Sequence, residues 1–545
     1  MEEFAELLDR LLLTPSRNGK LRLLVDHFRR QPDPERGYAL AALTGELDIS
    51  SVKPAMLRAL MTERMDEVLF GYSYDYVGDL AETIALVWPG PDVDAGDEAL
   101  TLSGIVAALE TASRREGPRL VEGWLDRLDS TGRYALLKLV TGSMRIGVSA
   151  RLAKQALADF GSRDVTEIEE LWHGLRPPYA GLFAWLEGRA DKPVSAALAP
   201  FRPVMLSHAL EAPDYPRIDP ELYAAEWKWD GIRVQATSDG GSRRLYSRTG
   251  DDISAAFPDL IDAMDYEGAI DGELLVARAA APGLAARGEG AAGIVAGTFS
   301  DLQQRLNRKA VSAAVMKKHP VFVRAYDLLQ DGATDLRALP YAERRARLKA
   351  FMERLDPTRF DLSPNVAYAD LDALEKLRMA PPHPVIEGVM LKRVDSPYLA
   401  GRPKGPWFKW KRDPHVIDAV LMYAQRGHGK RSSFYSDYTF GVWSGPDDAP
   451  ELVPVGKAYF GFTDAELKQL DKYVRDNTTE RFGPVRAVRA EPGHGLVIEV
   501  AFEGLQRSPR HRSGVAMRFP RVSRLRWDKP AFEADRIDTL IAMLD

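Results

Sequence analysis

The stretch from Glu226 to Arg233, EWKWDGIR, holds the residue types of a covalent active site. It places a lysine, a carboxylate, a glycine and an arginine in the spacing K-x-D-G-x-R. If the stretch is a strand, its side chains alternate between two faces. One face carries Glu226, Lys228 and Asp230, and the other carries Trp227 and Trp229. Gly231 then allows a tight turn. The pattern predicts that Lys228 is a nucleophile at the end of a strand. The alternative is an amphipathic strand with a solvated Lys/Glu face.

A lysine acts as a nucleophile only in its neutral form. The amine of a free lysine has a pKa near 10.4, so holding it neutral at pH 7 requires about 4 to 5 kcal/mol. Burial and neighbouring cations lower such a pKa. The chain supplies cations in five positions, namely Arg233, Arg248 in SRTG, Lys392 in EGVMLKR, and Lys409 and Lys411 in WFKWK. Converging cations need an anion, and a triphosphate provides one.

Two glutamates and one tyrosine extend this pattern. Glu273 in DGELL and Glu387 in EGVML stand next to glycines at expected strand ends. Mg²⁺ prefers one or two carboxylates together with phosphate oxygens, so both glutamates are candidate ligands. Tyr326 in RAYDLL can stack on a purine. For each of the three, an ordinary surface charge or core aromatic is the alternative.

Composition limits the class of protein. The 545 residues predict three or four domains. The absence of cysteine excludes disulfides and thiolate zinc sites and suits a cytoplasmic protein. The acidic start MEEFAELLDRLLLTP indicates no signal peptide, and we expect no membrane span. The net charge is −6, yet Leu505–Lys529 holds eight Lys/Arg against one acid, which indicates either a polyanion site or a solvated face.

The chain predicts a multidomain α and α+β protein with three domains. Residues 1–199 show helical periodicity. In residues 200–412, short β-branched and aromatic runs alternate with helical segments, which predicts a largely antiparallel sheet. Residues 413–545 contain about five strand patterns and one helix, which fits a small β-barrel of the OB type. Basic side chains gather in one helical stretch and suit either phosphates or the surface of an ordinary bundle, namely Arg133, Lys138, Arg145, Arg151 and Lys154.

Seven short motifs follow one another along the chain. They are KWDGIR (228–233), SRTG (247–250), DGEL (271–274), YD (326–327), EGVMLK (387–392), WFKWK (407–411) and RWDK (526–529). In type, order and spacing they resemble the nucleotidyltransferase motifs of ATP-dependent DNA ligases. The resemblance extends to PFRPVMLSH (200–208), FSDLQQRLNRK (299–309) and GKAYFGFTDAEL (456–467), and MRIGVSARLAKQAL (144–157) is a weaker match. One departure is Thr249-Gly250, where many members have Asn-Gly.

The resemblance implies a role for each motif residue. Lys228 would be the adenylylated lysine, supported by Asp230 and Gly231. Glu226 would help to select adenine, and Tyr326 would stack on it.

The remaining motif residues would handle phosphates and metal. The resemblance assigns Arg233 and Arg248 to the ribose, the nick 5′-phosphate or nearby phosphates, and it places Lys392 in the nucleotide site. Glu273 would bind the ribose or a metal, and Glu387 would bind Mg²⁺. Lys409 and Lys411 would bind the α-phosphate, and Arg526 and Lys529 would bind the leaving pyrophosphate. Mn²⁺ is an alternative metal.

The implied protein is a ligase that seals 5′-phosphate/3′-hydroxyl nicks in duplex DNA through lysyl-AMP and DNA-adenylate. The helical domain would bind DNA mainly through phosphates. The middle domain would be the adenylation domain, with an ATP-grasp-like fold. The OB-fold domain would turn about a hinge near Asp413. We expect a monomer. The alternatives are an RNA ligase or capping guanylyltransferase, and a non-catalytic DNA-binding scaffold. An NAD-dependent ligase is expected to carry a four-cysteine zinc site, which this chain cannot form.

Overall fold

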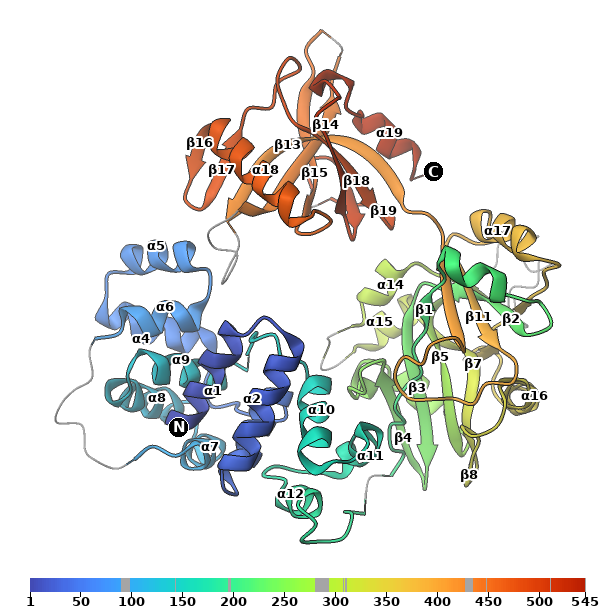
Figure 1. Ribbon diagram of the computed structural model, residues 1–545, viewed down its shortest axis with the longest axis horizontal. Helices are drawn as coiled ribbons and strands as arrows, with labels where there is room; N and C mark the ends of the chain where they lie inside the picture. The colour runs from blue at the N-terminus through green and yellow to red at the C-terminus, as the bar shows by residue number, and fades with distance from the viewer. Residues whose placement is uncertain are drawn as a thin grey trace. The chain divides into compact units, whose positions relative to one another are not determined.

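The computed structural model describes residues 1–89, 99–142, 144–194, 198–279, 294–306, 308, 311–426, 435–446, 448–509 and 511–544 (Figure 1). The chain divides into two compact units, one formed by Met1–Ala156 with Pro414–Asp545 and the other by Leu157–Asp413. We call Met1–Ala156 the helical part, Leu157–Asp413 the sheet unit and Pro414–Asp545 the C-terminal part. Every described helix falls short of the length and apolar character that a membrane crossing requires.

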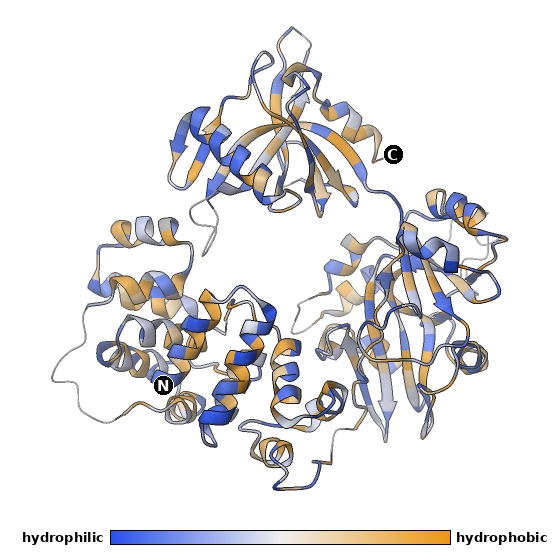
Figure 2. Ribbon diagram, viewed as in Figure 1, coloured by the Kyte–Doolittle hydropathy of each residue, from blue (hydrophilic) through white to orange (hydrophobic). Residues whose placement is uncertain are grey.

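The expected helical N-terminus is confirmed, since the described residues before His208 form helices and no strand. The helices are α1 (Glu2–Leu13), α2 (Arg17–Arg30), α3 (Glu35–Thr44), α4 (Pro54–Arg64), α5 (Glu67–Val77), α6 (Leu80–Val87), α7 (Leu102–Thr111), α8 (Glu116–Arg127), α9 (Ser130–Thr141), α10 (Ala150–Gly161), α11 (Val165–Leu171) and α12 (Ala180–Leu186). They carry hydrophobic residues on one side and hydrophilic residues on the other (Figure 2). Local chemistry sets their ends, as where the Asp129 carboxylate caps α9 through Gly132 N–H and Gly142 ends it in a left-handed conformation.

Two of the basic residues assigned to the surface of the helical part are buried instead. Arg133 is 3% exposed and donates to the carbonyls of Leu125 and Trp88. Lys138 is 2% exposed and forms an ion pair with Asp79 at 2.5 Å. Their charges are used to join helices, so neither residue is available to phosphates. The spacing of basic residues alone does not reveal which of them the packing encloses.

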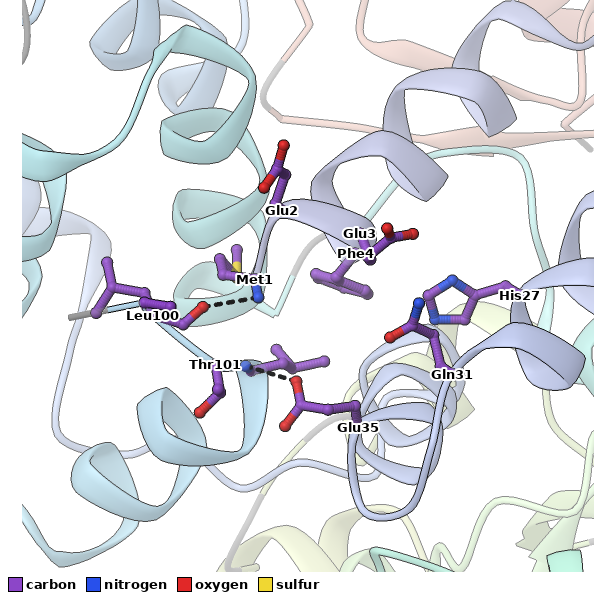
Figure 3. A pocket seen from close by; sticks show the side chains of 11 residues that line it. Met1, Glu2, Glu3, Phe4, His27, Gln31, Glu35, Leu100 and Thr101 are labelled. Carbon is purple, nitrogen blue, oxygen red and sulfur yellow. Dashed lines mark hydrogen bonds between the residues drawn. The ribbon is translucent and has the colours of Figure 1, made fainter. Parts of the chain in front are cut away.

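A pocket lies at the start of the chain, between α1, α2 and the start of α7 (Figure 3). The terminal amine of Met1 donates to the Leu100 carbonyl at 2.8 Å. The carboxylate of Glu35 accepts from Leu102 N–H at 2.8 Å and so caps α7. His27 also lines this pocket and is 4% exposed. Burial, with the nearby Arg30, lowers the pKa of His27 to about 4.

The sheet unit contains two mainly antiparallel sheets, as expected. The first sheet has the order β1 (His208–Ala209), β12 (Trp407–Lys411), β11 (Ile386–Arg393), β2 (Tyr223–Trp229) and β10 (Asn365–Val366). The second has the order β4 (Ser242–Ser247), β3 (Ile232–Asp239), β5 (Gly268–Ala279), β7 (Val321–Asp331) and β8 (Thr334–Asp335), with β6 (Ile294–Ala296) beside β5 and β9 (Phe360–Leu362) beside β7. Only β1 with β12 and β7 with β9 pair in parallel among the described strands.

Each sheet packs one apolar face against helices. Tyr223, Ala225 and Leu391 of the first sheet pack with Leu374 of α17 (Leu371–Met379). Val234 and Ile270 of the second sheet pack with residues of α13 (Pro258–Asp262) and α16 (Tyr341–Met352). The opposite faces meet each other, because Trp407 of β12 joins one cluster with Ala269 and Leu329 of the second sheet. The facing surfaces carry buried polar side chains, namely Glu226, Gln235, Asp271 and Asp327.

Helices α11 and α12 precede residue 199 and group with the sheets. The ring of His173, which follows α11, lies 4.8 Å from that of Tyr246. Glu170 of α11 forms an ion pair with Arg337 at 2.6 Å.

The C-terminal part is built around the long strand β13 (His415–Arg426), which pairs with β14 (Tyr435–Ser444) on one side and with β17 (Val485–Val488) and β18 (Val497–Phe502) on the other. The other elements are β15 (Glu451–Ala458), α18 (Asp464–Asp476), β16 (Thr478–Phe482), β19 (Gly504–Arg507), β20 (Val515–Arg518), β21 (Arg521–Arg526) and α19 (Ile537–Ala542). The sequence predicted about five strands here and the described residues contain nine. The missed β16 is exposed along most of its length, so it lacks an apolar alternation.

The run VAMRFPRV (515–522), which has the composition of a single strand, is divided between two strands. Phe519 has a φ of +50°, and Pro520 has no N–H to donate to a ladder, so β20 ends and β21 begins on either side of them.

The buried His27 predicts that the helical part loses stability in mild acid. The unfolded histidine binds a proton near pH 6.5, and the folded one only near pH 4. Stability is therefore complete above about pH 6.5 and falls as the pH drops towards 4, by about 2 kcal/mol between pH 7 and pH 5. Calorimetry at both pH values should show this loss in the wild type and a smaller one in His27→Leu.

The exposed His511 provides the control, since His511→Leu should keep the wild-type pH dependence. Equal losses in the wild type and in His27→Leu would contradict the assignment to His27.

Candidate active site

Lys228 lies near the end of β2, against the carboxylate of Glu387 from the neighbouring strand β11. Its Nζ donates to Glu387 Oε1, and Lys411 Nζ of β12 lies 3.1 Å from Oε2 of the same carboxylate. Gly388 is the register partner of both lysines, so β11 separates the strands that carry them. A single carboxylate thus bridges two lysines from strands on either side of it.

The backbone at Glu387 and Gly388 produces this arrangement. The register of β11 against β2 shifts between Ile386 and Gly388, which makes Glu387 the extra residue of a β-bulge. Gly388 has a φ of +151°, and a Cβ there would meet the Trp410 carbonyl and lie 2.7 Å from Lys411 Cα. Only glycine allows the strands to approach this closely. The bulge directs the Glu387 carboxylate between the lysines.

Lys409 and Arg248 add to the positive charge near the two lysines, whereas Lys392 binds Glu226 instead. Lys409 is the partner of Met390 on β11 and lies two residues from Lys411, on the same face. Burial lowers the pKa of Lys409, and the charges of Arg402, Lys228, Lys411 and Arg248 lower it further. Partial burial, with Arg233 and Arg402, also lowers the pKa of Arg248. An anion bound here would relieve this repulsion.

Glu273 of β5 is a second carboxylate that interacts with Lys228 and Glu387. Its Oε1 accepts from the Gly231 N–H at 3.2 Å. Burial raises the pKa of Glu273 to about 8; Lys228 opposes this shift, and the charge of Glu387 adds to it. Two carboxylates thus interact near Lys228, and a cation between them would stabilise both in the charged form. A Cβ on Gly231 would clash with the Leu274 carbonyl, which explains the glycine of the motif.

Arg233 is held by groups to which the sequence assigned no role. Its Nε and Nη2 donate to the Asp271 carboxylate at 3.0 and 2.6 Å, and Nη1 donates to the Met205 carbonyl at 2.7 Å. The hydroxyl of Tyr398 donates to Asp271 at 2.6 Å. Burial lowers the pKa of Arg233, but the Asp271 carboxylate outweighs it and raises that pKa well above its ordinary range. The side chain of Asp271 is fully buried, so this pair fixes the guanidinium in one position.

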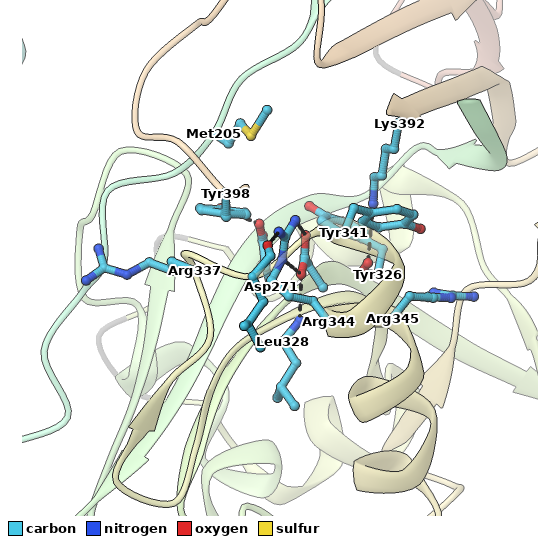
Figure 4. Close-up of polar contacts among 12 residues, drawn as sticks. Met205, Asp271, Tyr326, Leu328, Arg337, Tyr341, Arg344, Arg345, Lys392 and Tyr398 are labelled. Atoms are coloured by element: carbon cyan, nitrogen blue, oxygen red, sulfur yellow. Dashed lines mark hydrogen bonds and ion pairs between the residues drawn. The ribbon is translucent and has the colours of Figure 1, made fainter. Parts of the chain in front are cut away.

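Glu226, Lys392 and Tyr326 form a second polar group on the inner faces of the sheets. Lys392 Nζ donates to Glu226 Oε2 at 3.1 Å and to the Tyr326 carbonyl at 3.3 Å. It also lies 4.5 Å from the centroid of the Tyr326 ring (Figure 4). The register of β5 against β7 shifts between Asp271 and Gly272, so Tyr326, like Glu387, stands at a bulge. Glu226 is 1% exposed, which excludes the solvated Lys/Glu face weighed above.

Helix α16 supplies three further side chains, which the sequence identified only as part of a helix. The Tyr341 hydroxyl donates to Glu226, and Arg345 Nη1 lies 3.6 Å from the same carboxylate. Arg344 forms a fully buried ion pair with Asp327 at 2.8 Å (Figure 4). One signal in the sequence could have identified them. Tyr341, Arg344 and Arg345 are polar residues spaced three and four apart, so they lie on one face of the helix.

Thr249 stands where the sequence departs from the family pattern. Its hydroxyl donates to the Asp251 carboxylate, and Ser247 Oγ donates to the same oxygen at 3.0 Å. Gly250 completes the turn with a φ of +88°. Thr249 therefore closes the turn that carries Arg248.

Arg526 and Lys529 lie in the C-terminal part, where both contact Asp418 of β13. Arg526 Nη1 lies 3.2 Å and Lys529 Nζ 2.8 Å from Asp418 Oδ2. Arg526 also pairs with Asp528 at 2.9 Å. The motif RWDK is thus a folded turn whose two cations share the partly buried carboxylate of Asp418. Other arginines of the basic segment 505–529 also pair with carboxylates, as Arg524 does with Glu499, and Arg510 lies outside the described residues.

Comparisons with known proteins agree with this geometry. Residues 205–411 match the model described as "ATP dependent DNA ligase domain", and residues 431–529 match "ATP dependent DNA ligase C terminal region". A "Probable DNA ligase" from Koribacter versatilis is 30% identical over 99% of this chain and 95% of its own. "DNA ligase 1" from Korarchaeum cryptofilum is 30% identical over 99% of this chain and 97% of its own. The solved structure "Pmar-Lig_PreS3" has a TM-score of 0.56 at 14% identity and covers 96% of this chain and 99% of its own, which shows a shared fold.

The bulge at Glu387 predicts that Gly388→Ala destabilises the sheet unit. The new Cβ meets backbone atoms of β12 at an unfavourable φ, and together these effects cost about 2 to 4 kcal/mol. Calorimetry should show a fall of several degrees in the melting temperature of this unit.

Gly181→Ala, in α12 of the same unit, is the control, because its Cβ would meet nothing within 4 Å. An unchanged melting temperature for Gly388→Ala would contradict the steric account of the bulge.

Proposed function

Since the chain belongs to the ATP-dependent DNA ligase family, we propose that it joins the 5′-phosphate and 3′-hydroxyl of a nick in duplex DNA through an adenylate carried by Lys228. The observation that carries this proposal is the position of Lys228 among cations, with its amine against a carboxylate that Lys411 also binds. This arrangement supports phosphate chemistry at Lys228. A scaffold without catalysis would have no use for it.

In the first step the Lys228 amine attacks the α-phosphorus of ATP. A bond forms between Nζ and phosphorus, the bond from phosphorus to the pyrophosphate oxygen breaks, and the proton released by the attacking amine passes to water. A neighbouring carboxylate favours the charged form of an amine, so Lys228 must leave Glu387 before it reacts. The nucleotide phosphates supply anions that Lys409 and Lys411 can bind instead, and these cations stabilise the charge that spreads over the transferring phosphoryl group.

In the second step AMP passes from Lys228 to the 5′-phosphate of the nick. The 3′-hydroxyl then attacks this activated phosphate and AMP leaves. Arg233 and Arg248 are the proposed partners of the ribose or of these phosphates. The rigid pairing of Arg233 with Asp271 supports such a role, because a fixed guanidinium loses little entropy when it binds an anion.

A divalent metal fits the two carboxylates near Lys228. Glu273, whose pKa burial raises, gains a charge partner when a cation binds, and Glu387 can exchange its lysines for it. We assign both to Mg²⁺, which prefers one or two carboxylates with phosphate oxygens; Mn²⁺ is the alternative. The ion would neutralise phosphate charge.

The remaining assignments concern the base and the other domains. Glu226, Tyr326 and Lys392 are proposed to hold the adenine. Residues 1–199 are proposed to bind nicked DNA, residues 200–412 to form the nucleotidyltransferase (ATP-grasp-like) domain, and residues 413–545 to be an OB-fold that turns near Asp413. The change of compact unit between Asp413 and Pro414 supports a hinge there. We also propose that the protein is a monomer and works in the cytoplasm.

The nucleophile predicts a labelling result. Incubation with α-labelled ATP and Mg²⁺ should label the wild-type protein, and Lys228→Ala should abolish the label, because no other residue is assigned the attack. EDTA should also abolish it. Lys376→Ala, at an exposed lysine of the same unit, should label normally. Label from GTP or NAD⁺ in place of ATP would reassign the nucleotide, and a covalent label on Lys228→Ala would refute the assignment of the amine.

The C-terminal motif predicts a separation of steps. Arg526→Ala and Lys529→Ala should each slow the charging of Lys228 by about 100-fold, since each removes a cation from the leaving pyrophosphate. Sealing of a pre-adenylylated nick, which releases no pyrophosphate, should be nearly unchanged.

Arg524→Ala is the matched control, because Arg524 lies on the same strand β21 and its guanidinium forms an exposed ion pair with Glu499. Equal losses of charging and sealing in Arg526→Ala would contradict the proposed role of the motif.

A further inference from the structure

The carboxylate of Glu226 is fixed by donors from two elements. The hydroxyl of Tyr341 on α16 donates to Oε1, and Lys392 Nζ on β11 donates to Oε2 at 3.1 Å. Arg345 Nη1 lies 3.6 Å from Oε1. Tyr341 and Lys392, shown with Arg345 in Figure 4, are each 1% exposed, as is Glu226. The carboxylate therefore has one orientation, and its environment is almost free of water.

Tyr341 cannot easily move from this position. It is the first residue of α16, and its backbone N–H donates to the Ser396 carbonyl at 2.8 Å. The next residue, Ala342, donates to the Val394 carbonyl at 2.9 Å. Arg344, three residues on, ties the same turn to Asp327 through a fully buried ion pair. Hydrogen bonds fix the backbone of Tyr341, and an ion pair fixes the first turn of α16. The Tyr341 hydroxyl therefore stays directed at Glu226.

The groups around Glu226 use its carboxylate as a hydrogen-bond acceptor. The Tyr341 hydroxyl and the Lys392 amine both donate to it, and Arg345 Nη1 lies 3.6 Å away. An ionised carboxylate accepts hydrogen bonds and donates none. Such a group binds the 6-amino group of adenine, which is a donor, and opposes the 6-oxo group of guanine or hypoxanthine, which is an acceptor. Its discrimination depends on being held still, because a carboxylate free to turn can avoid the acceptor.

The contacts of Glu226 are distinct from those of the residues proposed to act on the phosphates. Lys392 also donates to the Tyr326 carbonyl at 3.3 Å, so Glu226 is linked to the tyrosine proposed to stack on the base. Lys228 and Lys411 bind Glu387 instead. A change at Tyr341 should therefore alter the choice of base and leave the transfer itself intact.

We infer that Tyr341 is a positioning residue for base selection: by holding the Glu226 carboxylate as an acceptor, it makes the nucleotide site prefer 6-aminopurine over 6-oxopurine triphosphates. This inference rests on the proposed function. It assigns to α16 a part in nucleotide choice that none of the sequence motifs contains.

Tyr341→Phe tests the inference, since it removes one hydroxyl and keeps the ring. The rates of Lys228 charging should be measured with α-labelled ATP and with ITP, whose base differs from adenine at the 6-position by an oxo group. The wild type should prefer ATP, and Tyr341→Phe should lower the ATP-to-ITP ratio of kcat/KM about tenfold, as expected for a lost hydrogen bond to a charged group. The change should appear mainly in KM.

A binding measurement separates this effect from chemistry. In a Lys228→Ala background, the rise in melting temperature with ATP should exceed that with ITP, and addition of Tyr341→Phe should reduce the difference. Tyr368→Phe is the matched control, because the Tyr368 hydroxyl donates to the Tyr223 carbonyl at 2.8 Å, and its ring packs in the cluster on the apolar face of the first sheet. It should leave the ratio unchanged.

Each outcome is decisive. Absence of any label on the wild type would overturn the proposed function, whereas a labelled wild type with the same ATP-to-ITP ratio in Tyr341→Phe would overturn this inference alone. An equal loss with both nucleotides would also overturn it, since that indicates a structural role only. If Tyr341→Phe does not fold, Glu226→Gln replaces it, because an amide can donate as well as accept and should shift the preference towards ITP.

Discussion

The bridge between Lys228, Glu387 and Lys411 is the interaction on which the site depends. It brings residues from three adjacent strands to one point, and it exists because Glu387 is the extra residue of a bulge and Gly388 accepts a backbone that other residues resist. Without the bulge, alternation would turn the carboxylate to the other face of β11, where Val389 and Leu391 pack. The lysines would then meet without an anion between them.

Buried ion pairs lie around this bridge, between the two sheets and the helices beside them. Arg233 with Asp271 and Arg344 with Asp327 lie on or beside the second sheet, and Arg324 with Asp361 lies nearby, its guanidinium 4.1 Å from the ring of Trp229. Buried pairs of this kind contribute little net stability compared with apolar residues of the same size. The role of these ion pairs is instead to hold charged side chains in fixed positions. They provide a polar interior with fixed hydrogen bonds, into which a charged nucleotide can enter without leaving donors unpaired.

The sequence predicted the parts of the structure that depend on local pattern. Alternation placed Glu226 and Lys228 on one face of β2, and the six motifs between residues 228 and 411 lie in the unit that holds both sheets. It could not predict Asp271, Tyr341 or Tyr398, because their contacts join strands and helices far apart in the chain. The pairing of Arg526 and Lys529 with Asp418 was missed for the same reason, as was the burial of Arg133 and Lys138. Basic residues look alike in sequence, and only packing decides which of them face solvent.

The pairing seen around Lys228 explains how a site rich in cations can be stable before nucleotide arrives. Glu387 satisfies two lysines, while Lys409 remains among like charges that lower its pKa. These cations are already partly removed from water, so a triphosphate that enters need not strip them of hydration again. It competes with one carboxylate for the lysines and brings more negative charge than that carboxylate does. In the proposed mechanism, the exchange would free the Lys228 amine to act as the nucleophile and free Glu387 to bind a metal. Arrival of the substrate would thus produce both functions from one ion-paired group.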